Sequence, residues 1–194
     1  MMRRFALLAL SSMLLMGATD YPAPQTMHQN GAAKWFGDVV LTDQDGKRVR
    51  LYQDLMDGNV VVINAFLAGC RASCPAVMGA LSHLHAQMAI DGIAANFVSI
   101  TVDPEHDTQE ALNLYAQALG AGPDWHMLTG EPAIVRGALH RFGLDTNPDE
   151  DPSDHLNIIY MANLRTGLWK KVFSLAPVED LETILLEVEN DVKQ

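Results

Sequence analysis

Cys70 and Cys74 are the only two cysteines in this 194-residue chain, and three residues separate them. Two thiols at this spacing can close into a disulfide, or they can bind one soft metal ion together. Both reactions need thiolate, which the positive end of a helix dipole stabilises. The pair therefore predicts redox or metal chemistry if it stands at the beginning of a helix.

The residues around the pair predict a strand before it and a helix after it. Residues 60–67 form an apolar run interrupted only by Asn64, which indicates a buried strand, and Ala68-Gly69 predicts a turn. From Pro75 to Ile90 the apolar residues recur at helical spacing, at Val77, Met78, Leu81, Leu84 and Met88. The two cysteines thus lie where a buried strand passes to a helix.

A purely structural disulfide is the plainest alternative for this pair. The loop between Cys70 and Cys74 spans about five residues, for which loop-closure entropy gives only about 2 kcal/mol. Such a bridge would stabilise the chain little, so a chemical role is favoured.

The remaining pattern predicts one α/β domain. A hairpin is expected from 39–41 and 49–51, and further strands at 94–102, 125–129, 156–162 and 168–173. Helices are expected from Asp107 or Thr108, either of which can cap, and over 132–142 and 177–192. We predict a thioredoxin-like three-layer sandwich with a central mixed sheet and an N-terminal β-hairpin extension. Thioredoxins place two residues between their cysteines; the third residue here lets both sulfurs face one metal ion.

Several segments resemble the SCO/SenC family, copper-delivering thioredoxin-fold proteins of cytochrome oxidase assembly. The resemblance covers roughly residues 34–190 and is most specific from Ser99 to Thr108. It rests on Cys70-x-x-x-Cys74-Pro75, on Ser99-Ile-Thr-Val-Asp-Pro-Glu-His-Asp-Thr108 with Ala111, Leu112 and Tyr115, on Trp125 to Gly130, and on Asp154-His155 before a strand.

The resemblance implies a copper site made by Cys70, Cys74 and His155. Thiolate and imidazole donors suit Cu(I), and the same set with one added ligand suits Cu(II). Asp103 and Asp154 are expected as outer carboxylates that orient His155 or hydrogen-bond near the site. The implied function is a metallochaperone that delivers copper to the dinuclear copper centre of a respiratory oxidase, with redox-coupled cysteines. Its expected partners are a copper-accepting oxidase subunit or a similar copper protein, and a thiol reductant.

Other functions stay open from the residues themselves. The main alternative is a thiol–disulfide oxidoreductase, in which one cysteine attacks a substrate disulfide and the other resolves the intermediate. That function needs both cysteines and makes His155 dispensable. A peroxiredoxin-type peroxidase and a copper or redox sensor are further alternatives. Ala68 and Arg71 depart from the family pattern, which leaves the identity of the acceptor open.

The other soft or basic side chains have simpler interpretations. His155 is an ordinary loop histidine if the family pattern is set aside. Met78, Met88 and Met127 are expected in the core. His83, His85 and His106 are expected at the surface or packed against neighbours.

The N-terminus has the layout of a secretory signal. Two arginines precede an apolar stretch over 5–18, which is shorter than the ~20 residues of a usual membrane span. We expect 1–18 to be a signal peptide or an uncleaved anchor, 19–33 a flexible spacer, and 34–194 the folded domain. The protein is then exported and periplasmic, or anchored in the inner membrane by this segment alone. The net charge of −11 argues against nucleic-acid binding, and we expect a monomer.

Overall fold

The computed structural model describes residues 31–37, 39–70, 73–144 and 158–192. Its centre is a sheet in the order β5-β4-β3-β6-β7. The strands β3 (Val60–Phe66), β4 (Asn96–Thr101) and β5 (Trp125–Leu128) are parallel to one another. On the other side, β6 (Ile158–Asn163) pairs antiparallel with β3, and β7 (Leu168–Phe173) pairs antiparallel with β6. The predicted mixed sheet is confirmed.

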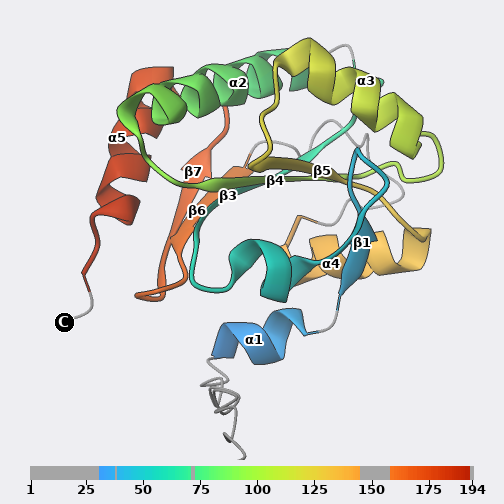
Figure 1. Cartoon of the computed structure of the whole chain (residues 1–194), viewed down its shortest axis with the longest axis horizontal. Helices are drawn as coiled ribbons and strands as arrows, with labels where there is room; N and C mark the ends of the chain where they lie inside the picture. Colours follow the sequence, from blue (N-terminus) through green and yellow to red (C-terminus); the bar gives the residue numbers. More distant parts are fainter. Residues whose placement is uncertain (1–30, 38, 71–72, 145–157, 193–194) are drawn as a thin grey trace, which may run out of the picture.

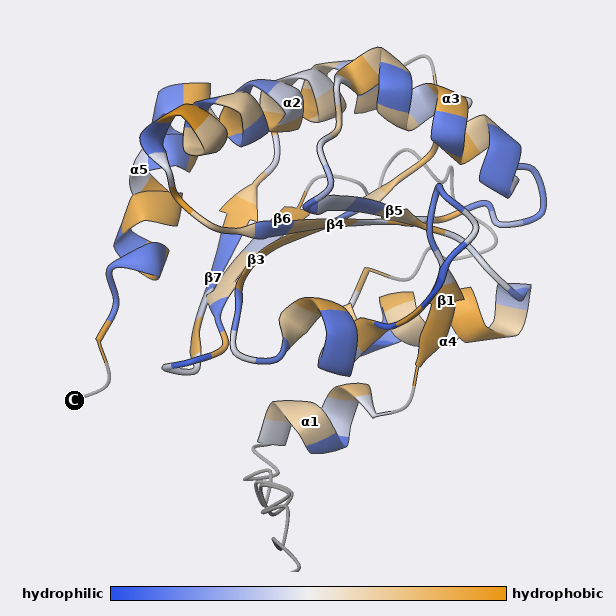
Figure 2. Cartoon of the chain, viewed as in Figure 1, coloured by the Kyte–Doolittle hydropathy of each residue, from blue (hydrophilic) through white to orange (hydrophobic). Residues whose placement is uncertain are grey.

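Helices cover both faces of this sheet (Figure 1). On one face lie α2 (Cys74–Asp91), α3 (Gln109–Leu119) and α5 (Val178–Glu189). On the other lie α1 (Gly31–Phe36), the short π-helical turn η1 (Leu51–Met56) and α4 (Pro132–Phe142). One buried apolar cluster fills each interface, and Figure 2 shows apolar residues along the central strands. The three-layer α/β sandwich is confirmed, and β3 is buried at every position because both of its faces are covered.

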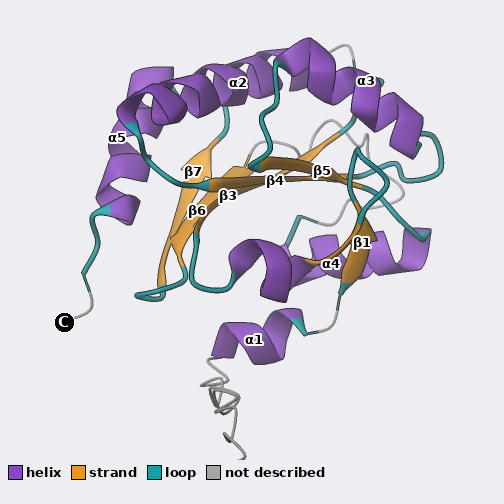
Figure 3. Cartoon of the chain, in the orientation of Figure 1, coloured by secondary structure: helices purple, strands orange, loops and turns teal. Residues whose placement is uncertain are grey.

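The predicted hairpin forms a small second sheet (Figure 3). β1 (Val40–Thr42) pairs antiparallel with β2 (Arg48–Arg50), and Thr42 also exchanges backbone hydrogen bonds with Thr129. The hairpin is therefore attached to the end of β5.

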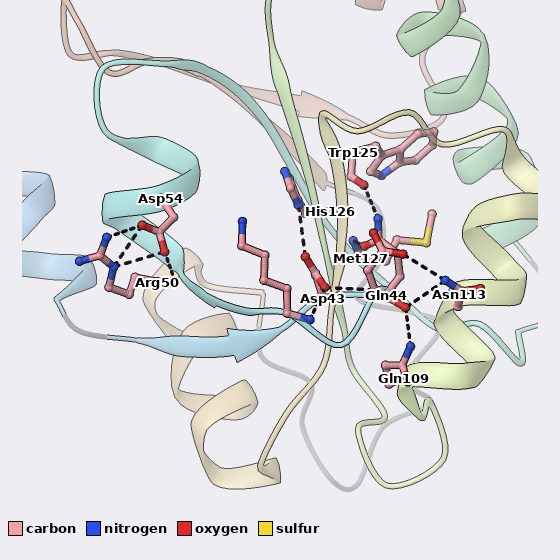
Figure 4. A network of polar contacts seen from close by, with 11 residues as sticks. Asp43, Gln44, Arg50, Asp54, Gln109, Asn113, Trp125, His126 and Met127 are labelled. Atoms are coloured by element: carbon pink, nitrogen blue, oxygen red, sulfur yellow. Dashed lines mark hydrogen bonds and ion pairs between the residues drawn. The ribbon is translucent and has the colours of Figure 1, made fainter.

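A buried glutamine completes this attachment (Figure 4). The Gln44 side chain donates to the Trp125 carbonyl at 2.9 Å and accepts from the Met127 amide at 2.8 Å. The Gln44 carbonyl in turn accepts from Gln109 at 2.7 Å and from Asn113 at 3.2 Å, both on α3. One side chain thus continues the hydrogen bonding of the edge strand β5, and the backbone of the same residue joins the hairpin to α3.

The elements differ from prediction mainly at their ends. α2 begins at Cys74 itself, one residue before the expected start. Residues 31–33, assigned to the spacer, form the first half of α1, while 19–30 lie outside the described residues. η1 was not anticipated, because a single helical turn leaves no repeated pattern in the sequence. Within the described part of the chain, no helix combines the length and apolar character needed to cross a membrane.

Candidate metal and thiol site

The cysteine turn, residues 67–70, connects β3 to α2. The Cys70 amide donates to the Leu67 carbonyl at 3.1 Å, which closes the turn around the predicted Ala68-Gly69. Cys74 is the first residue of α2, and Pro75 follows it in the first helical turn, where a missing N–H costs nothing. Neither cysteine is in a disulfide, and the two are close enough for a hydrogen bond between their side chains.

The two thiols occupy different environments. Cys74 is 2% exposed, whereas Cys70 is half-buried. Burial, and then the hydrogen bond and charge of Cys70, raise the pKa of Cys74 to about 12, against the lowering effect of nearby backbone hydrogen bonds. The expectation that the helix start favours thiolate is therefore wrong for Cys74, because desolvation of the charged form outweighs the helix terminus.

Below the first turn of α2, buried polar groups fasten the helix to the sheet. Trp125 Nε1 donates to Ser99 Oγ at 3.0 Å, and Ser99 Oγ donates to Asn64 Oδ1 at 2.7 Å. Asn64 Nδ2 reaches Met78 Sδ at 3.4 Å. Met78 lies one turn after Cys74 on α2 and is fully buried, so the helix that carries Cys74 has a fixed position over β3.

A carboxylate not predicted for the site contacts the cysteine turn. Asp107 Oδ2 accepts from the Ala68 amide at 3.1 Å and from the Thr101 hydroxyl at 2.5 Å. Burial raises the pKa of Asp107, and these two hydrogen bonds oppose the shift. Thr108 instead caps α3, where its side chain accepts from the Ala111 amide. The sequence offered Asp107 and Thr108 as alternative caps, and only the fold shows that Asp107 turns toward the cysteines.

An aromatic pair lies beside the site. Tyr115 of α3 stacks on Phe66, the last residue of β3, with ring centroids 5.8 Å apart. Burial raises the pKa of Tyr115 to about 12, with further contributions from the charges of Cys74, Cys70 and Asp107. The tyrosine is therefore a neutral neighbour of the thiols at physiological pH.

The antiparallel register brings the start of β6 to the cysteine end of the sheet. Asn64 of β3 pairs with Ile159, so β6 begins at the edge where β3 ends and the cysteine turn follows. Ile158 and Cys70 pack against the same buried cluster. Three sequence-predicted residues, His155, Asp154 and Arg71, lie outside the described residues. Among the described residues no group of three or more His, Cys, Asp or Glu side chains could hold a metal ion.

Asp103, predicted as an outer carboxylate near the site, has His106 as a partner within the described part of the chain. Its carboxylate bonds to Nδ1 of His106 at 2.9 Å, and this raises the pKa of His106. The Asp103 amide donates to Thr101 Oγ1 at 3.0 Å, so Asp103 is linked to Asp107 through that threonine.

Two histidines of α2 and the three methionines assigned to the core have the structural roles expected of them. His83 is exposed, and His85 is buried against Phe97 and Trp125 with Nε2 2.8 Å from Asp124 Oδ1. The three methionines assigned to the core, Met78, Met88 and Met127, are buried.

Most of the chain, including the cysteine turn and every strand of the main sheet, matches the model of one protein family. The SCO1/SenC family model matches residues 27–188. The chain belongs to the SCO1/SenC family. The resemblance seen in the sequence is thereby confirmed over nearly the range that carried it.

Curated relatives and solved structures agree with this SCO1/SenC membership. A SCO1 protein homolog from Bacillus subtilis is 29% identical over 124 residues, covering 61% of this chain and 63% of that protein, which is less than two thirds of its length. A SCO2-like protein from Rickettsia felis is 27% identical over 155 residues, covering 75% and 73% of the two chains.

Solved SCO structures share the fold, and some hold copper. Copper-bound ScoI from Bradyrhizobium japonicum is 25% identical with a TM-score of 0.63, over 78% of this chain and 98% of that one. Copper-bound yeast Sco1 is 21% identical with a TM-score of 0.66, over 80% and 93%. The thioredoxin-like architecture predicted from the sequence is confirmed by these matches.

Proposed function

We propose that this protein is an exported copper metallochaperone that binds one copper ion through Cys70, Cys74 and His155. The observation that carries the proposal is the contact between two thiols that form no disulfide, held where β3 passes to α2, in a family with copper-bound members. Two sulfur donors and one imidazole match the preference of Cu(I), and one added ligand completes a Cu(II) site.

The chemistry of the donors suits delivery rather than permanent storage. Cys70 is partly exposed, so an acceptor's ligands can approach copper from that side while Cys74 stays buried. We infer that the acceptor is the dinuclear copper centre of a respiratory oxidase, because solved relatives include a member of the Sco family of cytochrome c oxidase assembly proteins. Closing the Cys70–Cys74 disulfide removes both sulfur donors, so a thiol reductant is needed before reloading.

Residues 1–18 are proposed to direct the chain to the periplasm, either as a cleaved signal or as an inner-membrane anchor. The folded domain then works where an oxidising environment makes the reduced state of the cysteines depend on that reductant.

The test is a copper titration of the reduced chain beside three alanine variants. We expect one tightly bound copper per chain in the parent, and loss of tight binding in Cys70→Ala, Cys74→Ala and His155→Ala. His83→Ala is the matched control, because this exposed histidine on α2 has no place in the proposed site, and it should bind like the parent. Unchanged binding in His155→Ala would exclude the three-donor site.

A thiol–disulfide oxidoreductase is the second candidate, favoured by the unequal thiols. The more exposed Cys70 would attack a substrate disulfide, releasing one substrate thiol, and Cys74 would then displace the second. The products are the Cys70–Cys74 disulfide and a reduced substrate. This activity needs both cysteines and persists in His155→Ala, so that variant separates the two functions.

A further inference from the structure

We propose that Asp107 is the positioning residue of the cysteine turn: one of its carboxylate oxygens fixes the backbone that carries Cys70. The effect of Asp107 on copper binding rests on the proposed function. Its effect on the cysteine turn rests on hydrogen bonding alone.

The hydrogen bonds converge on a single atom. Asp107 Oδ2 accepts from the Ala68 amide at 3.1 Å and from Thr101 Oγ1 at 2.5 Å. Thr101 Oγ1 in turn accepts from the Asp103 amide at 3.0 Å. The segment after β4 and the turn after β3 are therefore joined through Asp107 and Thr101.

The carboxylate is too deeply buried for a surface role. Asp107 is 4% exposed and Thr101 is fully buried. Within the described residues, no lysine or arginine forms a salt bridge with Asp107, so its hydrogen bonds are the compensation for its burial. The capping of α3 does not require Asp107, because Thr108 provides it.

The hydrogen bond from the Ala68 amide to Asp107 affects the site because Ala68 lies close to Cys70 in the chain. Ala68 stands two residues before Cys70, inside the turn that the Cys70-to-Leu67 hydrogen bond closes. Because Asp107 holds the Ala68 amide, the backbone that carries Cys70 has a fixed position relative to Cys74 at the start of α2. Loss of a group that orients metal ligands typically costs about 10- to 100-fold in metal affinity.

Two substitutions separate acceptor geometry from charge. Asp107→Ala removes the acceptor. Asp107→Asn keeps one oxygen that can accept both hydrogen bonds, removes the charge, and replaces the other oxygen with an amide NH2 group. Glu105→Gln is the matched control, because Glu105 is an exposed carboxylate in the same loop and its partner in the structure is Arg136.

The first readout needs no copper: hydrogen exchange of the Ala68 amide in the reduced full chain, with the Ile63 amide of β3 as the reporter of global stability. We expect Asp107→Ala to accelerate exchange at Ala68 by about 10-fold or more relative to Ile63. Asp107→Asn and Glu105→Gln should stay within about 3-fold of the parent. Equal acceleration at Ala68 and Ile63, or none at Ala68, would overturn the proposal.

The second readout is copper affinity of the same variants. We expect about 10- to 100-fold weaker binding in Asp107→Ala and a change within about 3-fold in Asp107→Asn. Equal losses in both variants would assign the effect to charge and overturn the positioning role. If the parent binds no copper, the proposed function fails, and the exchange experiment still decides the role of Asp107.

Thr101→Val provides the test if Asp107→Ala does not fold. It preserves the shape of the threonine and removes the hydroxyl that orients the carboxylate. Faster exchange at Ala68 relative to Ile63, by about 3-fold or more, is expected. Exchange equal to that of the parent would contradict the proposal.

Discussion

At the scale of single residues, burial decides which thiol can react. A helix N-terminus stabilises a nearby negative charge by about 0.3–1 kcal/mol at exposed positions. Cys74 stands at such a terminus, yet burial raises its pKa to about 12. The half-buried Cys70 is therefore the thiol that solvent, a substrate disulfide or an acceptor protein meets first.

This difference predicts ordered alkylation of the metal-free, reduced protein. With a pKa of about 12, Cys74 is protonated at pH 8 and reacts slowly with iodoacetamide, which attacks thiolate. Peptide mass spectrometry should show Cys70 modified at least about 10-fold faster than Cys74. The ratio of the two alkylation rates should fall as the pH rises toward 12, because Cys74 then forms thiolate. Equal rates at pH 8 would contradict the burial argument.

The cysteines and Asp107 also show how far sequence reasoning reaches at this scale. The thiol pair could be found from residue type and spacing, because it needs only a strand, a turn and a helix in order. The protonation of Cys74 could not, because it depends chiefly on how deeply the folded chain buries this thiol. Aspartate is a common N-cap residue, so the sequence offers Asp107 as a helix cap. Only the tertiary structure shows that the Ala68 amide is its partner.

At the scale of elements, the hairpin secures the edge of the main sheet. β5 is one of the two terminal strands in the order, and an uncovered edge exposes unpaired backbone groups. Gln44 occupies that edge with one donor and one acceptor aimed at β5 (Figure 4). Strands and helices were predictable from periodicity, whereas this attachment depends on one polar side chain in a turn, about 80 residues from its partners.

Replacing Gln44 should therefore destabilise the fold. Gln44→Ala leaves the Trp125 carbonyl and the Met127 amide without their side-chain partner, at about 1–3 kcal/mol for each buried group. We expect the free energy of unfolding, measured in urea, to fall by about 2–4 kcal/mol. Gln117→Ala is the control, since Gln117 is exposed on α3, and its effect should stay within about 0.5 kcal/mol. A loss for Gln44→Ala no larger than for the control would contradict this role.

At the scale of the whole molecule, the sheet topology brings distant segments to one end. The cysteine turn follows β3, and the parallel neighbour β4 ends beside it, where the chain continues to Asp107. β6 runs antiparallel and begins at the same end, just after the sequence segment that contains His155. The layer arrangement could be predicted from the order of strands and helices, because parallel pairs need helical crossovers. That Cys70, Cys74 and His155 bind one copper ion at this end of the sheet stays a prediction.

The most direct test of that prediction is X-ray absorption at the copper edge of the copper-loaded protein and of His155→Ala. We predict two sulfur donors and one imidazole nitrogen in the parent, with the imidazole signal lost in the variant and both sulfurs retained. Identical spectra for the two proteins, or a copper environment without sulfur, would contradict a copper site shared by Cys70, Cys74 and His155.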